Sequence, residues 1–347
     1  MPEPLTITTQ AAPPAPGRAP VEPMDPRVDC IQPGGGVCIR IEQAWGRVRR
    51  WSLRTFRPGY VEKMRGLRRG DRNACPHEVL DPRDVKFHRN QEGYWWPADV
   101  DPFQWRDRLP FARVGLAELW LLGGGLAALA VGLGFVWWPL AIVPAVLAGL
   151  VAWFFRNPRR RVPTQAGLVV APADGKIVAL EELAHDDFLQ GPALKVGIFL
   201  SIFNVHINRT PVAARVIGLT YRPGKFLNAL AEASIVENEQ LAVRLEEAAA
   251  PHRRMIVRQI AGLFARRIVC WVKPGDTLDR GAQFGMIKLG SRTELVLPRE
   301  PGLRVLVRMG QSVTAGDTVL AQYEPQSRSA TAAEHSPSSA PAERDDA

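Results

Sequence analysis

Hydrophobic residues are spread unevenly along this 347-residue chain, and the longest apolar run lies near its middle. The 37 residues from Leu119 to Phe155 include no charged residue and no Ser, Thr, Asn or Gln. One straight helix of this length would overshoot a ~30 Å hydrocarbon core, which needs about 20 apolar residues. The pattern therefore predicts a membrane hairpin of two helices over residues 116–157, interrupted near Trp137-Trp138-Pro139. A buried helix pair in a soluble domain is the alternative, although such helices usually keep a polar face.

Arginines flank this apolar run on both sides. They are Arg106, Arg108 and Arg113 before it, and Arg156, Arg159, Arg160 and Arg161 after it. Because positively charged flanks tend to stay in the cytoplasm, both ends of the hairpin are expected on the cytoplasmic face of the cell membrane. The position of the run, more than a hundred residues into the chain, excludes a signal peptide.

The rest of the chain divides by composition. Residues 1–39 are rich in Pro, Ala and Gly, and residues 325–347 in Ser, Ala and Pro, so we expect both to be disordered. Residues 40–115 are basic and aromatic. In residues 160–324, short apolar runs separated by Gly and Pro predict strands, and the second half of residues 228–250 is helix-permissive. We expect a mainly β (α+β) domain there.

Two glycine-containing stretches of this domain resemble each other. Residues 272–281 (VKPGDTLDRG) and 307–316 (VRMGQSVTAG) share the pattern V-x-x-G-x-x-(L/V)-x-x-G. Glycine at these offsets permits the positive φ of tight turns between short strands. The pattern resembles the barrel-sandwich strands of biotinyl and lipoyl carriers, which present a lysine on an exposed hairpin, here Lys288. A membrane-tethered carrier module is one open interpretation, and plain scaffold is another.

Charge and cysteine content limit the partners. Lys and Arg total 44 against 35 Asp and Glu, a net charge of +9. Ten of these basic residues lie between Arg47 and Arg72, interleaved with aromatic side chains, which suits the surface of an anionic phospholipid membrane. With an apolar anchor nearby, residues 40–115 are predicted to be a membrane-surface segment rather than a nucleic-acid site or a solvated basic face.

The cysteines predict neither a disulfide scaffold nor a metal site. Four are too few to staple a chain of this length. The spacing of Cys30, Cys38, Cys75 and His77 matches no usual set of zinc ligands. We therefore expect free thiols.

Three short motifs carry polar residues suited to catalysis. They are PADGK with Asp174, FNVHINRTP with Asn204, His206 and Asn208, and the triplet Gly290-Ser291-Arg292. The first is expected on a tight turn, and alternation places the polar residues of the second on one face of an extended strand. Each motif taken alone is more typical of turns and exposed strands than of an active site.

Together with QIAGLFARRIVC at 259–270, these motifs resemble, in order and spacing, the short form of the phosphatidylserine decarboxylase proenzyme family. The resemblance runs from about Gly115 to Tyr323 and leaves residues 1–110 without a role. It implies decarboxylation of phosphatidylserine to phosphatidylethanolamine at the membrane through a Schiff base with a pyruvoyl group. A carrier-like or unprocessed binding module, and a decarboxylase of another serine phospholipid, are the alternatives.

The resemblance also implies how the cofactor arises. The Ser291 hydroxyl would attack the Gly290 carbonyl, and β-elimination would then split the chain into a β chain, residues 1–290, and a 57-residue α chain. Loss of ammonia would leave the pyruvoyl group, covalently bound, at the new N-terminus. No metal or diffusible cofactor is implied, and a homo-oligomer stays open.

Roles for further residues follow from the same resemblance. His206 is the implied general acid/base, and Asp174 is implied to orient or charge-pair the base that activates Ser291. The implied candidates for substrate binding are Asn208, Arg209 and Arg292. Compared with the long form of the family, Asn204 stands at an acidic position, Arg209 at that of a second histidine, and Arg292 at that of a Ser or Thr. The base for self-cleavage therefore stays open.

Overall fold

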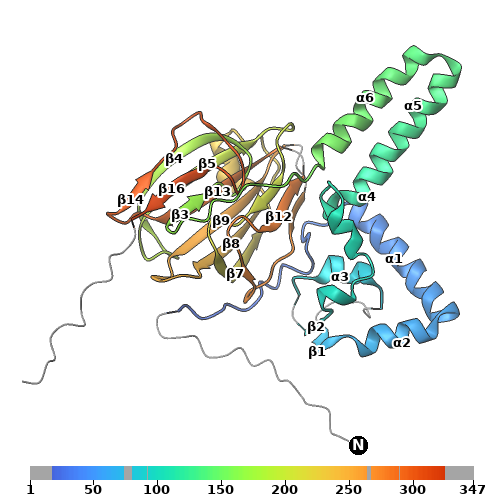
Figure 1. The fold of residues 1–347 in the computed structure, drawn as a ribbon, viewed down its shortest axis with the longest axis horizontal. Coiled ribbons are helices and arrows are strands. Elements are labelled where there is room, and N and C mark those ends of the chain that lie inside the picture. Colours follow the sequence, from blue (N-terminus) through green and yellow to red (C-terminus); the bar gives the residue numbers. More distant parts are fainter. Residues whose placement is uncertain (1–17, 74–79, 92, 264–266, 289, 325–347) are drawn as a thin grey trace, which may run out of the picture.

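The computed structural model describes residues 18–73, 80–91, 93–263, 267–288 and 290–324. They form a helical N-terminal part, a projecting pair of apolar helices and a strand-rich domain, an α+β architecture (Figure 1). The helices are α1 (Val37–Phe56), α2 (Pro58–Gly66), α3 (Pro82–His88), α4 (Leu116–Glu118), α5 (Gly124–Val136), α6 (Trp138–Phe154) and α7 (Glu232–Glu237). Short 3₁₀ helices are η1 (Ala98–Val100), η2 (Gln104–Arg108) and η3 (Arg113–Gly115), and η4 (Leu119–Gly123) is a π-helical turn between α4 and α5.

The strands divide between a small N-terminal sheet and the β domain. β1 (Arg69–Asn73) pairs with β2 (Gly93–Trp95). The β domain consists of β3 (Leu168–Val170), β4 (Gly175–Asp186), β5 (Gly191–Leu200), β6 (Ile207–Arg209), β7 (Ala214–Arg222), β8 (Gln240–Glu247), β9 (Arg254–Ala261), β10 (Arg267–Cys270), β11 (Thr277–Leu278), β12 (Gln283–Lys288), β13 (Ser291–Pro298), β14 (Leu303–Val305), β15 (Ser312–Val313) and β16 (Val319–Tyr323).

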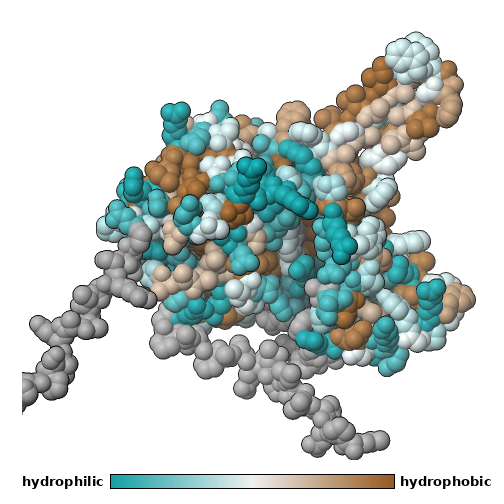
Figure 2. All heavy atoms as spheres, in the orientation of Figure 1, coloured by the Kyte–Doolittle hydropathy of each residue, from teal (hydrophilic) through white to brown (hydrophobic). Residues whose placement is uncertain are grey.

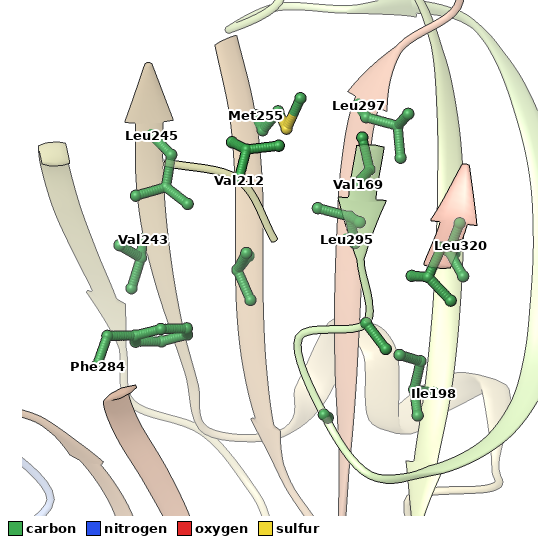
Figure 3. Packing of buried hydrophobic residues seen from close by; sticks show 14 of the residues in the cluster. Val169, Ile198, Val212, Val243, Leu245, Met255, Phe284, Leu295, Leu297 and Leu320 are labelled. Atoms are coloured by element: carbon green, nitrogen blue, oxygen red, sulfur yellow. The ribbon is translucent and has the colours of Figure 1, made fainter. Parts of the chain in front are cut away.

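An eight-stranded antiparallel sheet dominates the β domain. Its order is β11-β7-β8-β9-β13-β5-β4-β15, and two three-stranded sheets, β10-β12-β6 and β14-β16-β3, complete the domain. Apolar side chains at alternate positions, such as Val243 and Leu245 on β8 and Leu295 and Leu297 on β13, point into a common core (Figure 3). Each such fully buried side chain stabilises the fold by about 1.5–3 kcal/mol.

The strand pairings repeat in two halves of the β domain. From the central pair β9–β13, the large sheet runs outward through β8, β7 and β11 on one side and through β5, β4 and β15 on the other. The flanking pair β6–β12 corresponds to β3–β16. The two glycine motifs thus lie at opposite edges of one sheet, and their glycines adopt φ between +74° and +94°, as predicted. The repeated motif therefore belongs to a twofold repeat in the arrangement of the strands.

The helices α5 and α6 lie side by side and project away from the β domain (Figure 1). Small residues bring them together, with Gly123 facing Val151 and Gly134 facing Ala141. The helix α5 ends before Trp137, whose backbone is extended, and Pro139 lies in the first turn of α6. Residues 113–136 form a 24-residue helix long and apolar enough to cross a membrane. The pair is largely apolar on its outside (Figure 2), which argues against a buried core pair.

Two expectations from the sequence are wrong. Residues 18–36 are not disordered: the Glu22 N–H donates to Ile217 O, and Ile31 O accepts from the Cys270 N–H, so this segment runs along the β domain. The second half of residues 228–250 is strand β8 rather than helix, because period-two burial against the core overrides helix propensity. Residues 1–17 and 325–347, like Cys75 and His77, lie outside the described residues.

Part of the basic charge of residues 40–115 serves the fold of this segment. Arg50 on α1 is buried and donates to Asp84 on α3 over 2.8 Å. Lys86 on α3 reaches back to Glu42 on α1 over 2.7 Å. Because a buried charge is tolerated only when it is paired, these contacts hold α1 against α3.

Candidate active site

The junction between β12 and β13 combines a left-handed glycine with a buried serine. Gly290 has φ +60°, a conformation that favours glycine. Ser291 opens β13 between Leu200 of β5 and Ala261 of β9, and it is fully buried. Within the described residues, its Oγ has no hydrogen-bond partner. An unpaired buried hydroxyl costs about 1–3 kcal/mol, so its retention points to chemistry at this atom.

His206 reaches this junction from the start of β6. The Gly290 N–H donates to its Nε2 over 3.2 Å, and its Nδ1 lies 2.9 Å from the carbonyl oxygen of Asn204. These contacts assign the tautomer: Nδ1 carries the proton, and Nε2 presents its lone pair to the Gly290 N–H. The ring of Phe154, at the end of α6, contacts the imidazole at a tilt of 39°, with centroids 4.5 Å apart.

Burial controls the charge of His206. The desolvated site lowers the pKa of the imidazole to about 4, and the positive charge of Arg156 acts in the same direction. The hydrogen bond to Asn204 opposes this shift without reversing it. His206 is therefore neutral at pH 7 and able to accept a proton at Nε2.

Gly262 approaches the carbonyl group that self-cleavage would attack. A Cβ at Gly262 would lie 2.4 Å from the Gly290 oxygen and 3.1 Å from the Gly290 carbonyl carbon. Both atoms belong to the backbone and cannot rotate away. The absence of a side chain at Gly262 thus allows the Gly290 carbonyl to take its position.

A polar triplet ties together the strands around the site. Asn208 on β6 donates to Thr293 Oγ1 on β13 over 2.9 Å, and its Oδ1 accepts from Gln259 on β9 over 2.9 Å. All three side chains are fully buried. The amide of Asn208, predicted from the sequence as a substrate contact, is thus engaged between strands two residues from His206.

Asp174 lies in a different charge cluster. Its carboxylate accepts from Arg160 at 2.8 and 2.9 Å and from the Ala315 N–H at 2.8 Å. No hydrogen bond or ion pair joins Asp174 to His206 in the described part of the chain. Arg209 lies nearby and donates to Gly281 O over 2.8 Å. Burial lowers its pKa to about 10, which leaves it charged at pH 7.

Three other predicted positions point away from the site or differ in structure. Arg292 alternates to the face of β13 opposite Ser291, where its Nε donates to Glu294 over 3.0 Å. Asn204 is in a turn, not on a strand face, and its Oδ1 accepts from the backbone N–H and the hydroxyl of Ser201. Lys288 is largely buried and ion-paired with Glu118, which contradicts the exposed lysine of a carrier.

Sequence reasoning did not identify the residues that complete these contacts. In the sequence, Phe154 is one residue of the apolar run and Arg160 is one of the arginines that flank it. Gly262 is one residue of the motif QIAGLFARRIVC. A signal existed for Gly262, since a glycine close to an apolar, strand-like run can mark a close backbone approach. For Phe154 and Arg160, no local signal distinguishes them from their neighbours.

Comparison with known proteins gives a family for the chain. Residues 147–321 match the family model for phosphatidylserine decarboxylase. A phosphatidylserine decarboxylase proenzyme of Rhodopirellula baltica is 55% identical over 240 residues, which cover 69% of this chain and 99% of that protein. A protein of the same name from Symbiobacterium thermophilum is 48% identical over 203 residues, covering 58% of this chain and 93% of the relative.

Proposed function

The chain belongs to the phosphatidylserine decarboxylase family, and on this premise we propose that it decarboxylates phosphatidylserine to phosphatidylethanolamine with a pyruvoyl group made from its own Ser291. The observation that carries the mechanism is the buried Oγ of Ser291, which finds no hydrogen-bond partner among the described residues and directly follows a left-handed glycine. Gly290 and Ser291 thus fit a pyruvoyl group that forms from Ser291 itself.

In the proposed self-cleavage, Ser291 Oγ attacks the Gly290 carbonyl carbon while its proton passes to a base. The C–N bond between the two residues breaks, leaving an ester and a free amine. Loss of the Ser291 Cα proton then breaks the Cβ–Oγ bond and releases the Gly290 carboxylate. Water replaces the nitrogen, ammonia leaves, and the 57-residue α chain begins with a pyruvoyl group.

The surrounding residues have distinct tasks in this proposal. When formed, the pyruvoyl carbonyl supplies the electron-withdrawing group that decarboxylation of an amino acid requires. His206 accepts one proton at Nε2 and can then return it, and its neutral state at pH 7 supports the first of these steps. Phe154 covers the imidazole and keeps water from it. Asn208 keeps β6 in register with β13, and so holds His206 beside Gly290.

We propose that Asp174 acts through Arg160 as a positioning pair rather than through His206. Removing either partner leaves a largely buried charge without its counter-ion, which disturbs the turn before β4. Arg160→Ala should therefore slow self-cleavage about as much as Asp174→Ala, and the double variant should be no worse than either alone. The rate at which the α chain appears during cell-free synthesis measures this. Wild-type cleavage by Arg160→Ala beside a cleavage-dead Asp174→Ala would refute it.

The lowered pKa of His206 predicts an acid-sensitive proenzyme. The unfolded imidazole titrates near 6.5 and the folded one at about 4, so this contribution to stability is complete above pH 6.5 and lost as the pH falls to 4. At ~1.4 kcal/mol per pKa unit, the loss is about 3 kcal/mol. Unfolding of the uncleaved Ser291→Ala chain in detergent, followed between pH 7 and pH 4, measures it.

The matched variant for this measurement is Ser291→Ala with His206→Ala, whose stability should lack that part of the pH dependence. Equal pH profiles of the two proteins would mean that His206 titrates normally. In the chain that keeps Ser291, His206→Ala tests the catalytic role. Normal cleavage together with normal turnover would remove His206 from both steps.

We further propose that α5 and α6 anchor the enzyme from the cytoplasmic face of the cell membrane, close to its substrate. Exposed tryptophans support this: Trp120 and Trp153 lie at the base of the pair, and Trp137 and Trp138 at its tip. Tryptophan concentrates at both surfaces of a bilayer. At the base, Arg156 stacks on Trp153 with 4.0 Å between guanidinium and ring, where lipid headgroups would lie. We propose a likeness to biotinyl and lipoyl carrier domains only for the arrangement of the strands, not for a carrier function.

A further inference from the structure

The helix α1 exposes a continuous apolar stripe. Its members are Val37, Ile41, Trp45, Val48 and Trp51, each between 48% and 62% exposed. Their spacing of three or four residues places them on one face of the helix. The opposite face, with Ile39, Gly46 and Arg50, is buried against the rest of the N-terminal part. Within the described residues, the stripe is left open to its surroundings.

A row of cations follows one flank of this stripe. Arg40, Arg47 and Arg54 are seven residues apart, so they line up along the helix, and all three are exposed. The one acidic residue of α1, Glu42, lies toward the buried side and pairs with Lys86. The exposed face is therefore apolar and purely cationic, the composition of a helix that lies in a membrane interface.

The place of α1 in the fold supports the same partner. The helix contacts α4 and so starts at the base of the α5–α6 pair (Figure 1). From there α1 points in a different direction from the α5–α6 pair. The side of α1 can therefore lie along the surface of a bilayer that the pair enters. A second copy of the chain fits this face less well, because it would bring another arginine row and no acidic residue to pair with.

We infer that α1 lies in the plane of an anionic lipid leaflet, with its apolar stripe in the acyl boundary and Arg40, Arg47 and Arg54 on lipid phosphates. This surface lies outside residues 147–321, the region that matches the family. It rests on the proposed membrane anchor for its orientation and not on the decarboxylation chemistry. Each arginine near an anionic surface is worth about fivefold in affinity.

A depth probe on the full chain tests this inference. In a Cys38→Ser, Cys75→Ser background, Cys30 and Cys270 stay buried, and Val48→Cys takes a fluorescent label on the stripe. Asp187→Cys, exposed at the far end of β4 from the cleavage site, is the matched control. The proteins are placed in vesicles of phosphatidylcholine with a quarter phosphatidylglycerol and a nitroxide lipid. We expect label 48 to be quenched at least threefold more than label 187.

Further variants separate the outcomes. Arg40→Gln, Arg47→Gln and Arg54→Gln together should weaken quenching at 48, and so should pure phosphatidylcholine vesicles. Equal quenching at 48 and 187 would overturn the inference, as would shielding of label 48 by a second copy, seen as self-quenching without nitroxide quenching. A label at Phe135→Cys, near the tip of α5, reports the anchor itself, and chain cleavage and turnover in the same vesicles report the enzyme. Failure of α1 alone leaves those readouts intact.

Discussion

Replacing Ser291 with alanine is expected to leave one uncut chain of 347 residues without decarboxylase activity. In the proposed mechanism the Ser291 Oγ is the nucleophile and Ser291 is the source of the pyruvoyl carbonyl, so its loss removes both cleavage and the group on which turnover depends. Intact mass should show two chains for the wild type, the smaller of 57 residues with a blocked N-terminus, and a single chain for Ser291→Ala. Turnover should fall by a factor of at least about 10⁴.

A serine elsewhere in the β domain provides the control for this substitution. Ser312 opens β15, is exposed, and lies at the edge of the large sheet. Ser312→Ala should cleave and turn over like the wild type. A wild-type chain that stays whole yet decarboxylates its lipid, or an active Ser291→Ala variant, would rule out the pyruvoyl mechanism.

The second large effect is expected from Gly262→Ala. The added Cβ would lie 2.4 Å from the Gly290 oxygen, a distance that real Cβ contacts do not show, so the carbonyl must shift away from its place beside Ser291. Attack on a carbonyl carbon tolerates little displacement, and an error of 1 Å can cost about 100-fold in rate. We expect self-cleavage to slow at least that much. Time courses of α-chain appearance during cell-free synthesis give the rate.

The same substitution at an open position is the matched control for Gly262→Ala. Gly191 opens β5 in the same sheet, and a Cβ there meets nothing within 4 Å. Gly191→Ala should therefore cleave at the wild-type rate. Thermal unfolding of the Ser291→Ala chain with and without Gly262→Ala shows whether the variant still folds. If it folds and cleaves normally, the close approach to Gly290 has no part in the reaction.

The ion pairs of Asp174 and Arg292 show which parts of an active site can be predicted from motifs and which cannot. Motif resemblance placed Asp174 beside a base and Arg292 beside the substrate. In the structure, Asp174 belongs to Arg160, and Arg292 belongs to Glu294 on the far face of β13. Motifs identify the residue types that meet at a site. Only the sheet decides which pairs form.

Much of the architecture was predictable from local patterns. The run from Leu119 to Phe155 predicts two apolar helices, because length and the Trp-Pro break are local properties. The glycines of the repeated motif predict positive φ, because only glycine adopts it at no steric cost. The proposed self-cleavage position Gly290-Ser291 also comes from the sequence, through its resemblance to a family with that motif.

Only the tertiary structure decided how the site is assembled. His206 meets Gly290 across 84 positions of the chain, and Phe154, Gly262 and Arg160 reach their partners from other elements. Hydrophobic period and turn chemistry act over a few residues, whereas these contacts depend on strand order and register in the β domain. Tertiary structure was also needed for α1. The sequence shows only its basic and aromatic composition, and the burial of one face in the fold determines that the apolar stripe on the other face is exposed. Local patterns determined the helices and strands, and the packing of distant strands determined which side chains meet at the candidate active site.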